Sequence, residues 1–195
     1  MNYADFTHIP AALRNKAEME LRSGERILWT AQPIAARVGR ASWPLVIFGI
    51  FWTAFSVFWV AAAGWGAWRN STPGPFKLFP LFGVPFVLIG IGMLTSPIWM
   101  RKKAAKTVYM ITDQRAVILS QGLRGKTRVE SYAPAQLQSI TRDQFADGSG
   151  DIIFETRTWR DSDGDRRTSR VGFFAVPDVK TVEDHIRTLA QKITP

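Results

Sequence analysis

The chain of 195 residues contains no cysteine and only two histidines, His8 and His185. The lack of cysteine excludes disulfides, thiolate metal ligands and a cysteine nucleophile, and it fits a reducing compartment. No Ser-His-Asp set, phosphate-binding loop or paired metal motif is found. Residues 161–165 resemble the first half of a calcium loop, but Arg166 and Gly172 stand where that loop needs glycine and glutamate. We therefore expect no metal, no cofactor, no small-molecule substrate and no enzymatic activity.

Acidic residues are absent from the central part of the chain, between Glu25 and Asp113. Two runs in this part lack any charge: residues 41–68, with 28 residues, and residues 78–100, with 23. A helix of about 20 apolar residues crosses the hydrocarbon core of a bilayer. We therefore expect a transmembrane hairpin of two helices, residues 43–68 and 78–100, joined by an extracytoplasmic loop at 69–77. The alternative, a helical hairpin buried in a large soluble domain, fits such long aromatic runs less well.

Tryptophans mark both ends of the first run, and Trp99 lies at the end of the second, as expected where amphipathic rings collect at the headgroup level. Basic residues flank the runs on their outer sides, whereas the connecting loop has only Arg69 and Lys77. The flanking residues are Arg37, Arg40, Arg101, Lys102, Lys103 and Lys106. Because positive residues stay on the cytoplasmic side, we expect a multi-pass protein of the bacterial inner (cytoplasmic) membrane with both termini cytoplasmic. Neither run contains an ionisable residue, which argues against a pump or channel.

The same six basic residues are also candidates for binding anionic lipid headgroups. Juxtamembrane Lys and Arg are attracted to the negative cytoplasmic leaflet, although orientation alone is a sufficient reason for their presence. The net charge is +9, but the 17 basic and 12 acidic residues between 101 and 195 are interspersed. A nucleic-acid-binding domain would show a basic stripe, so we expect no nucleic acid partner.

Small residues predict how the two helices pack. Gly49, Thr53 and Ser56 form one stripe of the first helix, and Gly83 and Gly90 repeat at i+7 on the second. Small residues let transmembrane backbones approach closely, so the two stripes are expected to face each other. The alternative is that glycine is simply common in transmembrane helices. Pro85 and Pro97 should bend the second helix.

The segment before the first run, residues 1–42, is expected to be cytoplasmic. Residues 10–22 predict a short helix with Leu13, Ala17 and Leu21 on one face, which could lie on the membrane or pack on the soluble domain. Residues 24–33 then predict a strand, because apolar residues alternate and Pro33 closes the run.

The segment after the second run, residues 101–195, predicts an antiparallel α+β domain. Short strands separated by turn residues are expected at 107–112, 116–121, 127–132, 137–145, 151–159 and 167–176. A helix should follow over 177–193, with five apolar residues on one face: Val179, Val182, Ile186, Leu189 and Ile193. We expect this face to cap a bent sheet or small β-barrel.

Four pieces of the chain suggest a family: residues 24–29 (GERILW), 109–115 (YMITDQR), 150–153 (GDII) and the closing helix. Together they resemble the bacterial pleckstrin-homology-like (PH-like) domain family associated with membranes. The resemblance covers residues 24–33 and 101–195. It implies a seven-stranded bent sheet capped by a helix, often next to transmembrane helices, and no catalytic residues. Some relatives assist assembly of photosynthetic or other membrane complexes.

One structural expectation links the two parts of this resemblance. A lone strand at 25–30 would leave its backbone groups without partners, so it should join the sheet formed after Lys106. The leading functional hypothesis is a membrane-anchored interaction module, an accessory or assembly subunit of a larger bacterial membrane protein complex. The alternative is a peripheral sensor of anionic lipid headgroups. Membrane lipids and an integral membrane protein complex are the expected partners.

Overall fold

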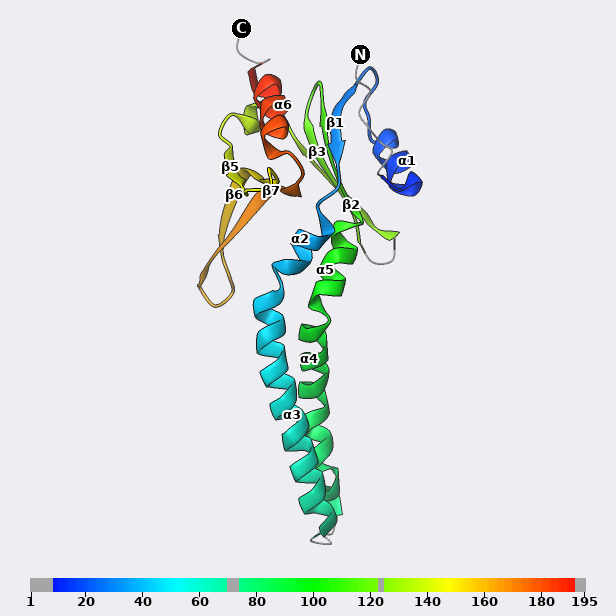
Figure 1. Ribbon diagram of the computed structural model, residues 1–195, viewed down its shortest axis with the longest axis vertical. Coiled ribbons are helices and arrows are strands. Elements are labelled where there is room, and N and C mark those ends of the chain that lie inside the picture. The colour runs from blue at the N-terminus through cyan, green and yellow to red at the C-terminus, as the bar shows by residue number, and fades with distance from the viewer. Residues whose placement is uncertain (1–8, 70–73, 123–124, 192–195) are drawn as a thin grey trace. The chain divides into compact units, whose positions relative to one another are not determined.

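The computed structural model describes residues 9–69, 74–122 and 125–191 (Figure 1). The chain forms two compact units. One unit combines Met1–Ala35 with Lys102–Pro195, and it holds helices and two antiparallel sheets. The other, Ala36–Arg101, is helical. The mixed unit is therefore assembled from two stretches of chain, with the helical unit inserted between them.

The first sheet has four antiparallel strands in the order β1-β2-β3-β4. These are β1 (Ile27–Ala31), β2 (Thr107–Thr112), β3 (Ala116–Gln121) and β4 (Thr127–Tyr132). In β1, Thr30 lies opposite Met110 of β2. The expectation that the strand before the insertion joins the sheet after it is thus confirmed, and β1 satisfies its backbone groups on β2.

The second sheet has three antiparallel strands in the order β5-β6-β7: β5 (Thr141–Gln144), β6 (Gly150–Arg160) and β7 (Arg166–Val176). The strand expected at 137–145 is shorter than predicted. Pro134–Leu137 forms the 3₁₀ turn η3, in which Leu137 is buried. Since this turn separates β4 from β5, the ladder does not run on from one sheet to the other. The two sheets do not form a closed barrel, which corrects the barrel alternative.

Helix α6 (Val179–Gln191) buries Val179, Val182, Ile186 and Leu189, as its periodicity predicts. These side chains share one core with residues of both sheets, including Ile111 of the first sheet and Phe173 of the second. The helix begins at Val179 rather than at Pro177, because the Asp178 carboxylate accepts hydrogen bonds from the Thr181 N–H and hydroxyl. Ile193, the fifth residue of the expected stripe, lies outside the described residues.

Helix α1 (Ala11–Met19) covers the opposite face of the first sheet. Its buried Leu13 and Ala17 form a second core with Val108 and Met110 of β2 and with residues of β3. Consequently every residue of β2 is buried. This packing decides between the two alternatives for the N-terminal helix: it packs on the sheet of the mixed unit.

The helical unit contains α2 (Ala35–Arg40), α3 (Trp43–Arg69), η1 (Gly74–Gly83), α4 (Val84–Leu94) and α5 (Ser96–Ala104), whose last turn passes into the mixed unit. Helix α3 matches the first predicted span, and it belongs to the one helix among the described residues that is long and apolar enough to cross a membrane. The prediction of a single second helix at 78–100 is wrong. That run is divided into η1, α4 and part of α5. Residues 70–73 of the expected loop lie outside the described residues, and Gly74 already begins η1.

Prolines account for this division. Pro80 lies inside η1, Pro85 stands in the first turn of α4, and Pro97 is the second residue of α5. A proline lacks the N–H of the helical ladder and disfavours helical geometry in the residue before it. The segments Leu78–Leu94 and Ser96–Ala104 meet at an angle of 47°, so the predicted bend of this run is confirmed.

Candidate functional site

The small residues singled out from the sequence lie along the contact between α3 and the segments η1 and α4. A Cβ atom added at Gly90 would collide with the Thr53 side chain, and one added at Gly83 would collide with Val60. A Cβ at Gly49 would lie 2.8 Å from Cβ of Met93. Glycine at these positions therefore sets how closely the backbones approach.

We predict that Gly90→Ala will separate α3 from α4, whereas Gly92→Ala will not. Both glycines lie in α4, but a Cβ at Gly92 would meet nothing within 4 Å. The distance between spin labels on cysteines introduced at Trp52 and Phe86, whose rings lie 6.1 Å apart across the same contact, would report the change in spacing in the otherwise Cys-free chain. An equal effect of the two substitutions would mean that helix propensity, rather than close packing, is responsible.

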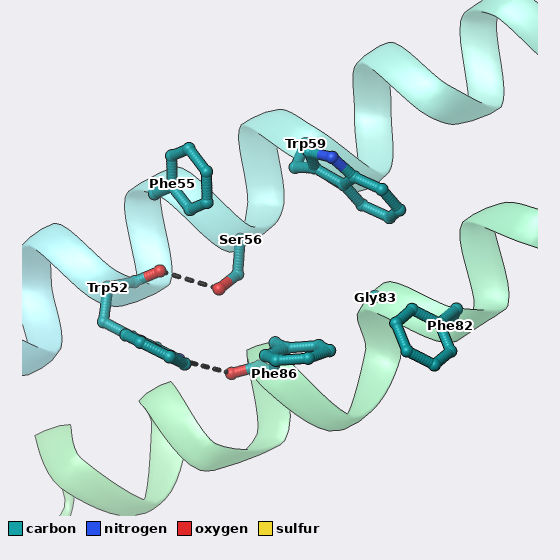
Figure 2. Close-up of a pocket in the computed structure, with 7 residues that line it drawn as sticks. All are labelled: Trp52, Phe55, Ser56, Trp59, Phe82, Gly83 and Phe86. Carbon is teal, nitrogen blue, oxygen red and sulfur yellow. Dashed lines mark hydrogen bonds between the residues drawn. The ribbon is translucent and has the colours of Figure 1, made fainter.

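A cavity of about 230 Å³ opens along the same contact, as Figure 2 shows. One hydrogen bond between the helices and one within α3 engage polar atoms at its wall. Trp52 Nε1 donates a hydrogen bond to the Phe86 carbonyl at 3.0 Å, and Ser56 Oγ donates one to the Trp52 carbonyl at 2.8 Å. The cavity can therefore take an apolar group but has little to offer a polar one. It is lined by Trp52, Phe55, Ser56, Trp59, Phe82, Gly83 and Phe86.

The candidate lipid-binding residues lie at the ends of the apolar helices. Arg37 and Arg40 belong to α2, Arg101, Lys102 and Lys103 belong to α5, and Lys106 follows α5. Five of the six are exposed, and Arg37 is half-buried. The Arg101 side chain packs over Gly39, where an added Cβ would lie 2.7 Å from Arg101 Nε. The positions are compatible with both roles expected for these residues, orientation and headgroup binding.

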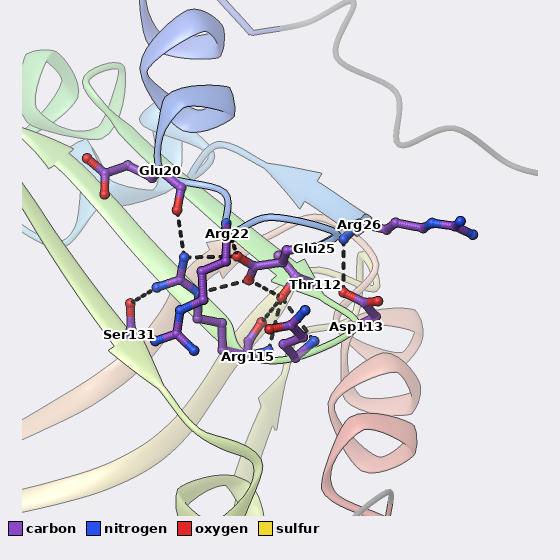
Figure 3. Close-up of polar contacts among 9 residues, drawn as sticks. Glu20, Arg22, Glu25, Arg26, Thr112, Asp113, Arg115 and Ser131 are labelled. Atoms are coloured by element: carbon purple, nitrogen blue, oxygen red, sulfur yellow. Dashed lines mark hydrogen bonds and ion pairs between the residues drawn. The ribbon is translucent and has the colours of Figure 1, made fainter.

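A buried ion pair lies in the mixed unit, where two of the stretches that suggested the PH-like family meet (Figure 3). Arg115 Nε is 2.8 Å from Glu25 Oε1, and Arg115 Nη2 is 3.0 Å from Glu25 Oε2. The Glu25 side chain is 0% exposed and that of Arg115 is 11% exposed. Sequence reasoning singled out both stretches but missed this pairing. Glu25 precedes the inserted helical unit in the sequence and Arg115 follows it, so no local pattern links them.

Further hydrogen bonds complete the junction. The Thr112 hydroxyl and the Arg22 N–H each donate to the Glu25 carboxylate at 2.7 Å. Arg115 also donates to Ser131 Oγ at 2.8 Å and to the Glu20 carbonyl at 2.6 Å. Burial by itself raises the pKa of Glu25, but the hydrogen bonds from Arg115, Arg22 and Thr112 outweigh burial and lower it to about 2. The carboxylate is thus permanently ionised at neutral pH and unsuited to act as a general base.

The acidic loop that resembles part of a calcium site forms the turn between β6 and β7. The Asp161 N–H donates to the Asp165 carbonyl, and Gly164 takes a positive φ of 85°. Among the residues that the structure describes, no group of three or more His, Asp or Glu side chains is arranged to hold a metal ion.

The described geometry thus presents an apolar cavity, a basic set at the helix ends and a buried ion pair that joins two distant stretches of chain. What the protein does must follow from these residues, because similarity adds no information. No protein-family model, no curated protein and no solved structure matches the chain.

Proposed function

We propose that the protein is a membrane-anchored, non-enzymatic interaction module that serves as an accessory or assembly subunit of a larger bacterial membrane complex. The main support is the surface of α3. Only 11% of the most apolar stretch of its helix is buried, and Phe51 and Phe58 are 72% and 71% exposed. Exposed apolar surface of this extent is costly in water and is satisfied by lipid or by a partner helix.

In this proposal the second span is the bent pair Leu78–Leu94 and Ser96–Ala104, which together are long and apolar enough to cross a membrane. A proline-kinked helix is tolerated in a membrane, where neighbouring groups satisfy the freed carbonyls. The Thr95 hydroxyl donates to the Ile91 carbonyl at 2.8 Å, next to the bend. Two spans would return the chain to the cytoplasmic side of the inner membrane.

The PH-like assignment of the mixed unit is part of the proposal. Its support is the arrangement of four plus three antiparallel strands and one closing helix among the described residues. The resemblance implies seven strands and a capping helix, and two of its stretches share the ion pair between Glu25 and Arg115. PH-like domains next to membrane spans fit a binding role better than a catalytic one.

Protein binding is favoured over simple anchoring by the number of contact surfaces. The exposed aromatic side chains of α3 and the cavity beside them offer one surface, and the mixed unit offers another. Only Ala105 and Lys106 separate α5 from β2. Such a short tether keeps the soluble unit near the bilayer and raises the effective concentration of a weak contact.

The topology can be tested with thiol probes, because the native chain has no cysteine. We expect a cysteine at Ser71 to react with an impermeant reagent added from outside and a cysteine at Ser162 to stay unreacted until the cells are opened. The basic flanks of the two runs give this orientation. Reaction at Ser162 but not at Ser71 in intact cells would reverse it.

The partner itself is tested by purification in a mild detergent, followed by identification of co-eluting proteins. We expect a membrane protein to co-elute in a fixed stoichiometric ratio. We also expect the assembly of this partner with the chain to weaken when the mixed unit is destabilised. A solitary chain with bound anionic lipid, together with intact membrane complexes in a deletion strain, would contradict the proposal. That outcome would favour the lipid-sensor alternative, with the basic set at the helix ends as its site.

A further inference from the structure

Strands β6 and β7 extend as a two-stranded ribbon beyond the end of β5, as Figure 1 shows. Strand β5 pairs only with residues 150–153 of β6. From Glu155 to Arg160, β6 pairs with β7 alone, up to the facing residues Arg160 and Arg166. This outer part of the hairpin is mostly exposed.

The two faces of this ribbon differ in how their charges are balanced. Residues directly opposite in an antiparallel pair share a face, and faces alternate along each strand. We call the face that carries the half-buried Val171 the inner face. Its two arginines have partners: Arg157 pairs with Glu155, and Arg167 pairs with Asp161 of the turn. The inner face is therefore neutralised within the hairpin.

The outer face has arginines but no acidic side chain of its own. It consists of Thr156, Thr158, Arg160, Arg166, Thr168 and Arg170. None of the described ion pairs or side-chain hydrogen bonds involves its three arginines, and all six side chains are exposed. Arg160 lies directly opposite Arg166. Like charges placed directly opposite one another destabilise a strand pair, so this arrangement is unfavourable in the isolated protein.

We propose that this outer face of the β6–β7 hairpin docks an acidic segment of a partner protein. The inference rests on the proposed function, since it names the partner chemistry of the same interaction module. A guanidinium group binds a carboxylate through two parallel hydrogen bonds. Carboxylates bound between Arg160 and Arg166 would relieve their mutual repulsion, and Arg170 extends the row along the same face.

The turn of the hairpin favours an acidic protein segment over an anionic bilayer. Asp161, Asp163 and Asp165 lie at the tip, and only Asp161 has a described ion-pair partner. An anionic lipid surface is broad, so it would meet the tip carboxylates together with the arginines. The carboxylates would repel it. An extended or helical segment is narrow enough to follow the outer face without reaching the tip.

The first test measures binding of fluorescently labelled poly-L-glutamate to the full chain in an uncharged detergent. The double variant R160Q/R166Q removes two outer charges, and the matched control R157Q/R167Q removes two inner charges from the same hairpin. We expect the outer variant to bind roughly three- to tenfold more weakly and the control to stay within about twofold of the unmodified protein, given the modest strength of exposed ion pairs. Equal losses would show that net charge alone matters and would overturn the proposal.

The second test separates binding from stability. Arg166→Glu places an acidic side chain opposite Arg160, which replaces a like-charge pair by an attractive one. We therefore expect the melting temperature of the variant to rise while its affinity for poly-L-glutamate falls. A purely structural role would change the two together, so a variant that is less stable, or that binds as well as before, would contradict the docking surface.

Two further probes decide the class of partner. Nanodiscs of phosphatidylcholine mixed equally with phosphatidylglycerol offer anionic lipid, and duplex DNA offers phosphates on a polymer. The assignment to an acidic protein would be overturned if R160Q/R166Q weakened binding of either probe as much as it weakens binding of poly-L-glutamate, while R157Q/R167Q did not. The proposed function is judged separately: a co-purified partner retained by R160Q/R166Q would leave that function standing and reject this surface, whereas the lack of any partner would reject the function.

Discussion

Replacing Arg115 by leucine should destabilise the mixed unit by about 3–5 kcal/mol, because it leaves the Glu25 carboxylate buried without its partner. The Glu20 carbonyl and the Ser131 hydroxyl also lose a hydrogen-bond donor. Exchange of the β2 amide hydrogens in the full chain measures the effect, since β2 is buried on both faces and reports global unfolding. The exchange rates should rise about 100-fold or more.

A matched control is available in the same sheet. Arg128 pairs with Glu130, but its side chain is 69% exposed. Arg128→Leu should therefore change stability by about 1 kcal/mol or less. The double variant Glu25→Leu with Arg115→Leu should recover much of the loss, because it removes both charges. A double variant that is as unstable as Arg115→Leu alone would mean that packing of the guanidinium, not charge pairing, stabilises the junction.

The pH dependence of stability gives an independent measurement of the same pair. The pKa of Glu25 is lowered from 4.5 to about 2 in the folded chain. A carboxylate with a depressed pKa contributes stability above its unfolded value, and this contribution is lost as the pH falls from about 4.5 to about 2. The loss amounts to about 3 kcal/mol. It should be missing from the double leucine variant, and an equal acid sensitivity there would assign the effect to other carboxylates.

Ile186→Ala should cost about 2–5 kcal/mol, since Ile186 is completely buried in the middle of the apolar face of α6. That is a large share of the ~5–15 kcal/mol that stabilises a typical domain. Denaturant unfolding of the full chain measures the loss, and hydrogen exchange of the β6 and β7 amides in the native state measures it independently. A fragment of residues 101–195 would be unsuitable, because it lacks both β1 and Glu25.

The control for Ile186→Ala lies on the same helix. Thr188 is exposed and hydrogen-bonds only to the Asp184 carbonyl one turn earlier. Thr188→Ala should change stability by about 0.5 kcal/mol or less. If Ile186→Ala were equally mild, α6 would not stabilise the sheets and the shared core would be energetically unimportant.

The local elements were accessible from the sequence because their signals are local. Short strand-like runs separated by turn residues predicted β2, β3 and β4 at the observed bounds, and the 3-4 spacing predicted the buried face of α6. The length of the first uncharged run predicted α3 to within one residue. The prolines gave the bend of the second run but not its division into a 3₁₀ segment and two helices. Whether backbone groups freed by proline find other partners depends on the neighbouring helix.

The sequence by itself therefore determined the strand and helix segments and the apolar character of the inserted unit. Only the tertiary structure decided that α1 covers the first sheet and that Glu25 meets Arg115 across the insertion. It also decided that Arg160 faces Arg166. Periodicity and hydropathy describe one stretch of chain at a time, whereas these contacts depend on which surfaces remain uncovered after the sheets have formed. Their free energy arises from burial and charge pairing between distant residues, which no local pattern records.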